Sequence, residues 1–143
     1  ENLKLSENLL RDITIDEPDF ENAYYVLASI YFDRNDMSAS KDICDEGLEY
    51  LPKSYKLHYK KALACNELSL YDEGRIHAEK ALKINKKYYP AIYELGISWM
   101  NLCNKYEAEK AFKKAARDRK FKKESNKYLD GALNSHIKQN CSS

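Results

Sequence analysis

The chain has 143 residues, 33% of them charged, with only four glycines and three prolines. This length suits a single domain, and apolar residues at helical spacing favour an almost entirely helical protein over an all-β or collagen-like one. No apolar run approaches the roughly 20 residues that cross a bilayer, and no signal-peptide pattern opens the chain, so we expect a soluble protein with no membrane partner.

The N-terminal part predicts one helix followed by a break. Residues 1–13 carry a rough apolar stripe, which is typical of an amphipathic helix. Pro18 predicts a break, because proline lacks a backbone N–H and disfavours helix in the residue before it.

The middle of the chain predicts three helix pairs, and the Asn35–Asp36 sequence marks the first turn. The periodicity places the helices of the first two pairs at residues 21–34, 37–50, 54–68 and 71–84. The third pair lies within residues 89–116 and has a break at residues 102–105.

These pairs recur with a spacing of 34 residues, and small or apolar residues coincide at the same stations. The coinciding sets are Leu27, Lys61 and Leu95; Ala28, Ala62 and Gly96; Tyr31, Cys65 and Trp99; Ser40, Gly74 and Ala108; and Gly47, Ala81 and Ala115. Small residues that recur where two helices cross predict close packing between them, and a single hairpin cannot bury both of its faces.

The best copy reads Ile92-x2-Leu95-Gly96-x2-Trp99 and then Ala108-x3-Phe112, with Pro52 and Pro18 as closing prolines of other copies. This pattern resembles the tetratricopeptide repeat family. The chain departs from it at Lys61, Ala78, Cys44, Lys86 and Lys120.

The resemblance implies an all-α, right-handed superhelical solenoid of stacked antiparallel helix pairs. It divides the chain into the second helix of a preceding partial repeat at 1–14, repeats at 21–54, 55–88 and 89–120, and a capping helix at 121–139. The cap is expected because arrays need a terminal helix with one face toward water, and Asp130 stands where the repeats place a small residue. We expect the polar tail 139–143 to be disordered.

The resemblance also implies that the first helix of each repeat lines a concave groove. The expected partner-binding residues are Asn22, Tyr25, Ser29, Phe32, Lys56, Tyr59, Lys60, Leu63, Asn66, Tyr93, Glu94, Ile97 and Met100. Tyr25, Tyr59 and Tyr93 form a row at one station, and tyrosine is enriched in binding patches. The alternative is that each ring packs on the next repeat and supports the superhelix.

Some members of this family hold the C-terminal carboxylate of chaperone tails with a basic clamp. The matching positions here are Tyr25, Ser29, Lys60, Pro90 and Glu94. Only Lys60 is basic and Glu94 would repel a carboxylate, so a chaperone tail is not expected.

The four cysteines and three histidines show no metal-ligand spacing and no disulfide framework, so we expect no metal, no cofactor and a reducing, cytoplasmic setting. Cys44 and Cys65 lie on inward stripes, where a free thiol behaves as a small apolar group. His136 and Cys141 could in principle share a metal, but two ligands are a weak signal.

Charge is unevenly distributed: residues 1–50 hold thirteen acidic and four basic side chains, and residues 51–143 hold ten and twenty. The basic half is either a solvated face, a surface for an acidic protein, or one end of a head-to-tail contact with the acidic end of another copy. We expect no nucleic-acid partner, because aromatic and basic residues lie on different faces.

The sequence therefore favours a non-catalytic adaptor that binds a peptide segment of a partner protein. It shows no Gly-rich phosphate loop and no nucleophile motif, and His58 and His77 read as structural. Glu94 and Glu107 are expected to be single carboxylates at the surface. The alternative is an architectural segment of a longer superhelix or multi-subunit assembly, which would associate with itself through its ends as a homo-oligomer.

Overall fold

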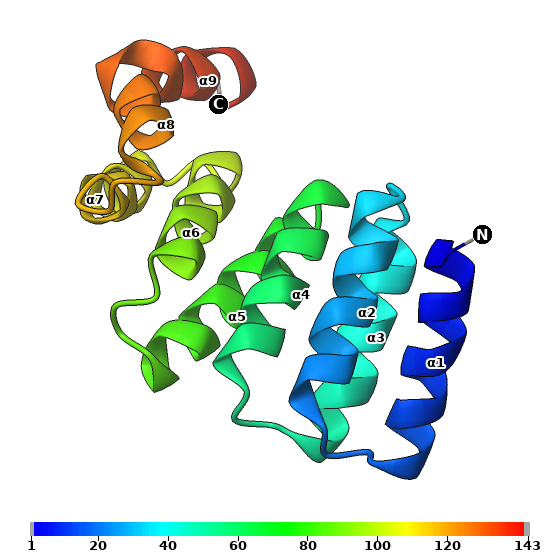
Figure 1. Ribbon diagram of the computed structural model, residues 1–143. Helices are drawn as coiled ribbons and strands as arrows, with labels where there is room; N and C mark the ends of the chain where they lie inside the picture. Colours follow the sequence, from blue (N-terminus) through cyan, green and yellow to red (C-terminus); the bar gives the residue numbers. More distant parts are fainter. Residues whose placement is uncertain (1, 142–143) are drawn as a thin grey trace.

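The computed structural model describes residues 2–141, which form a row of helices with no strand among them (Figure 1). Three antiparallel pairs follow the N-terminal helix α1 (Asn2–Asp16). They are α2 (Glu21–Asp33) with α3 (Met37–Tyr50), α4 (Tyr55–Glu67) with α5 (Tyr71–Ile84), and α6 (Tyr89–Asn101) with α7 (Lys105–Ala115). Within the described part of the chain, no helix is both long and apolar enough to span a bilayer.

The pairs stack into a right-handed superhelical solenoid, and the two ends of the chain lie at opposite ends of the row (Figure 1). The first helices of successive pairs touch, α2 with α4 and α4 with α6. The second helices α3, α5 and α7 are separated by pockets described below. The first helices therefore line the inner side of the curve, and the second helices lie on its outer side.

The three hairpin turns share one backbone feature. Asn35, Ser69 and Cys103 have positive φ angles of 63°, 62° and 64°, and they occupy the same station of the 34-residue spacing. A single left-handed residue commonly ends a helix and redirects the chain. The side chains of Asp36 and Asn104 then accept a hydrogen bond from the first turn of the next helix.

Close helix crossings explain the recurring small residues. A Cβ atom on Gly47 would lie 2.8 Å from Cγ of Tyr24, and one on Gly96 would lie 2.8 Å from Cε1 of Phe112. Tyr24 and Phe112 are fully buried, so their rings fill the space that the glycines leave. The prediction of close packing at these stations is confirmed.

The N-terminal helix is longer than the sequence suggested and ends before Pro18. It packs on α2, and the Tyr24 hydroxyl donates a hydrogen bond of 2.8 Å to the Pro18 carbonyl oxygen. Leu3, Leu5, Leu9 and Ile15 on this helix are more than half exposed.

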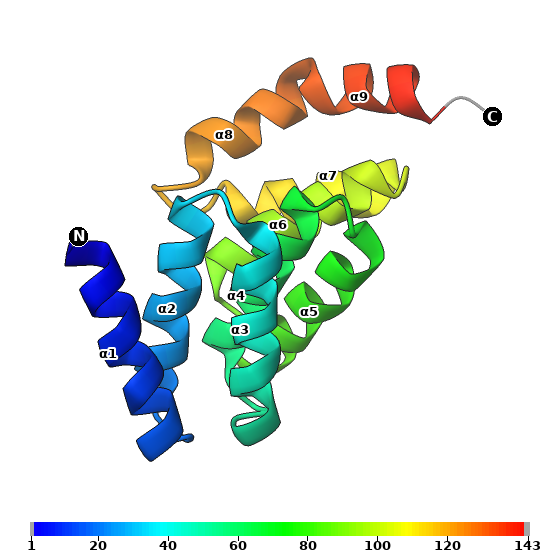
Figure 2. The ribbon, with the colours of Figure 1, turned by 90° about the vertical axis from the view of Figure 1, so that its right-hand side faces the viewer.

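The C-terminal segment differs from the single capping helix that we expected. It consists of α8 (Lys122–Lys127), a π-helical turn (Tyr128–Ala132) and α9 (Leu133–Asn140), and it lies against α6 and α7 (Figure 2). Gly131 interrupts the helical backbone with φ 158° and ψ −27°. Of the expected disordered tail, residues 139–141 are ordered, and residues 142–143 lie outside the described residues.

A disulfide joins Cys103, in the α6–α7 turn, to Cys141, directly after α9. The expectation that the chain has no disulfide was therefore wrong. No short spacing signals this bond, because its two cysteines are 38 residues apart and meet only when the C-terminal segment returns over the last helix pair. Disulfides are typical of oxidising compartments, so the sequence argument for a reducing setting is lost. Cys44 and Cys65 are free and buried, as predicted.

Candidate functional site

The inner surface presents a different side chain from each first helix at one repeated station. Val26 on α2 is 43% exposed, Lys60 on α4 is half-buried, and Glu94 on α6 is buried at 8% exposed. An apolar group, a cation and a carboxyl group therefore follow one another across three neighbouring helices.

Lys60 is held by two aromatic rings from α2. Its Nζ atom lies 5.1 Å from the ring centre of Tyr25 and 5.5 Å from that of Phe32, which is within the range of cation–π attraction. Burial lowers the pKa of Lys60. Three of the predicted groove residues thus form one compact cluster.

The tyrosine row packs on neighbouring elements rather than standing free. The ring of Tyr59 lies 5.4 Å from that of Tyr88, in an edge-to-face arrangement. Tyr93 lies 5.8 Å from Phe112 and 5.4 Å from Phe121, so it belongs to the core beneath the C-terminal segment. Burial raises the pKa of both Tyr59 and Tyr93. The alternative interpretation, that the rings support the superhelix, therefore describes Tyr93 well.

Glu94 is buried, and the expectation that it lies at the surface was wrong. Nδ2 of Asn66 donates to Oε2 of Glu94 at 2.9 Å and to its backbone carbonyl at 3.1 Å. The Ser98 hydroxyl donates to Oδ1 of Asn66 at 2.8 Å, which fixes the orientation of the amide. Gly74 makes room for this amide, because a Cβ atom there would lie 2.2 Å from Oδ1.

The pKa of Glu94 is raised to about 7, chiefly by burial; the Asn66 hydrogen bond acts in the opposite direction, and the Glu67 carboxylate also raises it. The cause is desolvation, which disfavours a charged carboxylate far more than a neutral acid. Glu94 thus titrates near neutral pH while it faces the inner surface.

Glu94 opens into a cavity of about 390 Å³, which we call the inner pocket. Five of the predicted groove residues line it: Asn66, Tyr93, Glu94, Ile97 and Met100. The sequence reasoning missed its other lining residues, which are Glu67, Ser69, Tyr71, Asn101 and Tyr128. Glu67 and Asn101 share one station of the 34-residue spacing, directly after the predicted Asn66 and Met100, so that station could have been included, whereas Tyr128 comes from the non-repeating C-terminal segment.

The remaining predicted residues are spread along the inner surface. Asn22 is exposed, and Lys56 and Leu63 are half-buried outside the inner pocket. Ser29 is turned onto its own helix, where its hydroxyl donates to the Tyr25 carbonyl oxygen at 2.9 Å.

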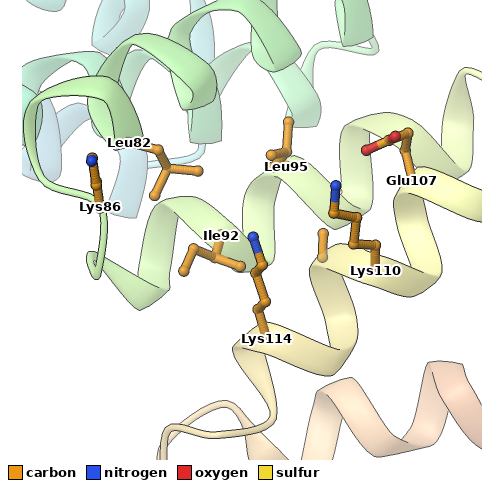
Figure 3. Close-up of a pocket in the computed structure, with 8 residues that line it drawn as sticks. Leu82, Lys86, Ile92, Leu95, Glu107, Lys110 and Lys114 are labelled. Carbon is orange, nitrogen blue, oxygen red and sulfur yellow. The ribbon is translucent and has the colours of Figure 1, made fainter.

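A second cavity, of about 320 Å³, lies on the outer side between α5, α6 and α7, and we call it the outer pocket (Figure 3). Leu82, Ile92, Leu95 and Ala111 provide apolar walls. Charged side chains surround them: Lys86, Glu107, Lys110 and Lys114. One repeat earlier, another cavity has His58, Lys61 and His77 at the stations of Ile92, Leu95 and Ala111. The repeat spacing therefore relates two pockets that differ at these three stations, with polar side chains in one and apolar side chains in the other.

In the part of the chain that the structure describes, no three His, Cys, Asp or Glu side chains are grouped so that they could hold a metal ion. His136 lies on α9, while Cys141 is bonded to Cys103 and is not available as a metal ligand.

Solved structures of MamA share this fold. One crystal structure of MamA matches with a TM-score of 0.75 at 14% identity, over 93% of this chain and 81% of that chain. A second MamA crystal structure has a TM-score of 0.68 at 22% identity, over 85% of this chain and 65% of that chain. A structure of MamA from Desulfovibrio magneticus RS-1 has a TM-score of 0.67 at 15% identity, over 97% and 93%.

No protein-family model matches the sequence, and no curated protein matches it. At the identities given above, the likeness to MamA establishes a shared helical-repeat fold and nothing about what this chain binds.

Proposed function

We propose that the chain is a non-catalytic, tetratricopeptide-type interaction module that binds a peptide segment of a partner protein along its inner surface. The observation that supports this most directly is the Val26, Lys60 and Glu94 series, which presents three different chemistries on one face of adjacent helices. A surface that served packing alone would need no such series of accessible apolar and buried charged groups.

An extended peptide segment suits the spacing between the three helices that carry Val26, Lys60 and Glu94. Packed helices lie about 8 to 10 Å apart, and an extended chain advances about 3.3 Å per residue. Every third residue of a bound strand would then meet a new station. Such a ligand gains its specificity from a few side chains and its affinity from the length of the contact.

A carboxylate tail remains a poor candidate for the ligand. Glu94 stands at the matching clamp position, and its buried acid group disfavours a second negative charge nearby. Lys60 already interacts with two aromatic rings. The proposed partner is therefore recognised along its side chains rather than at its terminus.

The test is selection of peptides from a random-sequence display library against the full chain. Selected peptides should bind the Val26→Asp variant at least about tenfold more weakly, because an added carboxylate in the contact costs about 1.4 kcal/mol or more. Ile76→Asp is the matched control, since Ile76 on α5 is 39% exposed and lies outside the inner surface. Equal binding to both variants, or no selected peptide at all, would refute the proposal.

Self-association is the second candidate, and the exposed leucines of α1 favour it. Leu5 and Leu9 are 60% and 55% exposed on the acidic half of the chain. On the outer side, between α5, α6 and α7, the outer pocket offers apolar walls with three lysines and one glutamate around them (Figure 3). The α1 helix of one copy could therefore dock at the outer pocket of the next, joined by apolar contact and opposite charge.

Sedimentation velocity at low and high salt tests this candidate. Charge pairing between exposed groups is screened over about 10 Å at 0.1 M salt, so the association should weaken as salt is added. A Leu9→Gln variant should remain monomeric, whereas Tyr106→Gln, at a 72% exposed aromatic residue on α7, should not change the association. A wild-type monomer at both salt concentrations would exclude self-association.

A further inference from the structure

We propose that the inner pocket binds the basic side chain, arginine or lysine, of the partner peptide, with Glu94 as its counter-ion. This inference rests on the proposed function and adds to it the chemistry of the ligand at one station. It is carried by a buried carboxyl group at the wall of a cavity whose lining offers it no cation.

The hydrogen bonds of Glu94 leave it able to accept a ligand. Asn66 donates to Oε2, and the structure shows no second side chain donating to the carboxyl group among the described residues. Oε1 accepts no hydrogen bond from a described side chain and is not completely buried, and Glu94 lines the inner pocket. One carboxyl oxygen is therefore held by Asn66, while the other is left without a donor from the described side chains.

The charge around the inner pocket is of one sign. Its lining includes two carboxyl groups, Glu67 and Glu94, and none of the described residues that line it is lysine or arginine. A buried carboxylate without a cation is costly, and a paired, hydrogen-bonded cation relieves that cost. A basic ligand is thus the occupant that the electrostatics favour.

The aromatic lining suits the same ligand. Three tyrosines, Tyr71, Tyr93 and Tyr128, are among the residues that line the pocket, although the rings of Tyr93 and Tyr128 also pack on Phe112. Ring faces attract cations, and the flat guanidinium group of arginine stacks on them while it donates two hydrogen bonds to a carboxylate. We therefore expect arginine to bind more tightly than lysine.

The neighbouring station restricts the ligand further. Lys60 stands one repeat before Glu94 and would repel a second basic side chain there. A bound strand that places arginine at Glu94 should carry a neutral or acidic residue about three positions away, given the rise of about 3.3 Å per residue.

The first test uses two small probes, N-acetyl-arginine amide and N-acetyl-citrulline amide, which differ in charge but hardly in shape. Added to the full chain, the arginine probe should give saturable shifts of the Asn66 side-chain amide in nitrogen-15 NMR spectra. A dissociation constant on the order of millimolar is reasonable for so small a contact. The citrulline probe should give none.

The matched variants are Glu94→Gln and Glu49→Gln. Glutamine keeps the size of Glu94 and can still accept from Asn66, but it removes the charge, so the arginine shifts should vanish. Glu49 is exposed on α3 and does not line the inner pocket, so its variant should bind like the wild type. Circular dichroism melting of both variants confirms that they are folded. Equal shifts from both probes, or arginine binding that survives Glu94→Gln, would overturn the inference.

The pH dependence gives an independent readout. Because the pKa of Glu94 is raised to about 7, arginine binding should strengthen from about pH 6 to about pH 8 as the carboxyl group ionises. Glu67 on α4 faces the same cavity, as do the Tyr71, Tyr93 and Tyr128 hydroxyls, and Tyr59 also lies near Glu94. Binding that is flat across this range would count against Glu94 as the counter-ion.

The library selection separates this inference from the proposed function. Peptides selected by the wild type should be richer in arginine and lysine than those selected by Glu94→Gln. If both proteins select peptides of equal basic content, the groove binds peptides but the inner pocket does not bind a basic side chain. If neither selects a peptide but the arginine probe binds, the inner pocket is real and the peptide-binding function is not.

Discussion

His58 and His77 face each other across the second helix pair, with their Nδ1 atoms 3.0 Å apart and their rings stacked. Nε2 of His58 lies 2.8 Å from the Pro52 carbonyl oxygen, which can only accept, so Nε2 carries the proton. Nδ1 of His58 is then an acceptor, and Nδ1 of His77 is the donor. Both rings are neutral in this arrangement, and a proton added to Nδ1 of His58 would break it.

This pair predicts a loss of stability in mild acid. Burial lowers the pKa of both rings, that of His77 to about 3, whereas an unfolded histidine titrates near 6.5. Below about pH 6.5 the unfolded chain therefore binds more protons than the folded one. The free energy of unfolding then decreases as the pH is lowered. The loss at about pH 5 should be on the order of 1 kcal/mol, allowing for solvent screening of the half-buried His77.

The repeat itself supplies the variant for this test. Replacing His58 with Ile and His77 with Ala gives this pair the residues that the next repeat has as Ile92 and Ala111. Its urea midpoint should change less between about pH 7 and about pH 5 than that of the wild type. His136→Ala is the control and should keep the acid sensitivity. An unchanged slope in the double variant would show that other groups cause it.

The disulfide predicts sensitivity to reduction. Cross-linking two residues 38 apart reduces the entropy of the unfolded chain, which is worth about 2 to 4 kcal/mol. Reducing agent should therefore lower the melting temperature of the wild type and leave a Cys103→Ser, Cys141→Ser variant unaffected. Thiol titration under denaturing conditions should find only Cys44 and Cys65 before reduction. A reductant effect of equal size in the variant would contradict the assignment.

The contact between Gly96 and Phe112 predicts that alanine at position 96 destabilises the protein. Helix propensity alone predicts a gain of about 1 kcal/mol, because alanine is the better helix former. The new Cβ atom would meet a ring that is fully buried and stacks on Tyr128 at 4.6 Å, so the ring cannot move away. We expect a net loss of about 1 to 3 kcal/mol in urea unfolding. Ser135→Ala, at an exposed position of α9, should have almost no effect; a stabilised Gly96→Ala would mean that the crossing is looser than described.

The repeat spacing made the helix pairs predictable nearly to the residue. Predicted helices at 37–50 and 71–84 correspond to α3 and α5, because a helix crossing at fixed intervals demands small residues at fixed positions. The turns show why the 34-residue spacing predicts the backbone better than local composition does. Asn35 reads as a turn residue, but Ser69 and Cys103 adopt the same left-handed backbone without such a signal.

Features that depend on two distant segments could not be predicted. The C-terminal bend at Gly131 and the bond to Cys141 follow from the return of the last segment over α6 and α7, which no periodic pattern encodes. Glu94 was placed on the inner surface, but its burial depends on Asn66 and on the space at Gly74, each from a different helix. The 34-residue spacing predicts which side of a helix a residue occupies, whereas its burial depends on side chains from other helices.

Glu94 itself predicts a stability change opposite in sign to that of the histidine pair. Its pKa is raised to about 7 in the folded chain from an ordinary 4.5, so between these values the folded protein retains a proton that the unfolded chain releases. Stability from this group is therefore lost as pH rises through that window, and the cost is complete above about pH 7.

The Glu94→Gln variant should accordingly be more stable than the wild type at about pH 8, by about 1 to 3 kcal/mol, and nearly equal to it at about pH 4. Urea unfolding at both pH values measures this difference without any ligand. Glu49→Gln, at an exposed position, should match the wild type at each pH. Because a bound cation would remove the same cost, the arginine probe should raise the wild-type midpoint at about pH 8 and leave that of Glu94→Gln unchanged. A variant that loses stability at high pH would show that the ionised carboxylate is already compensated within the fold, and that the inner pocket has no need of a cation.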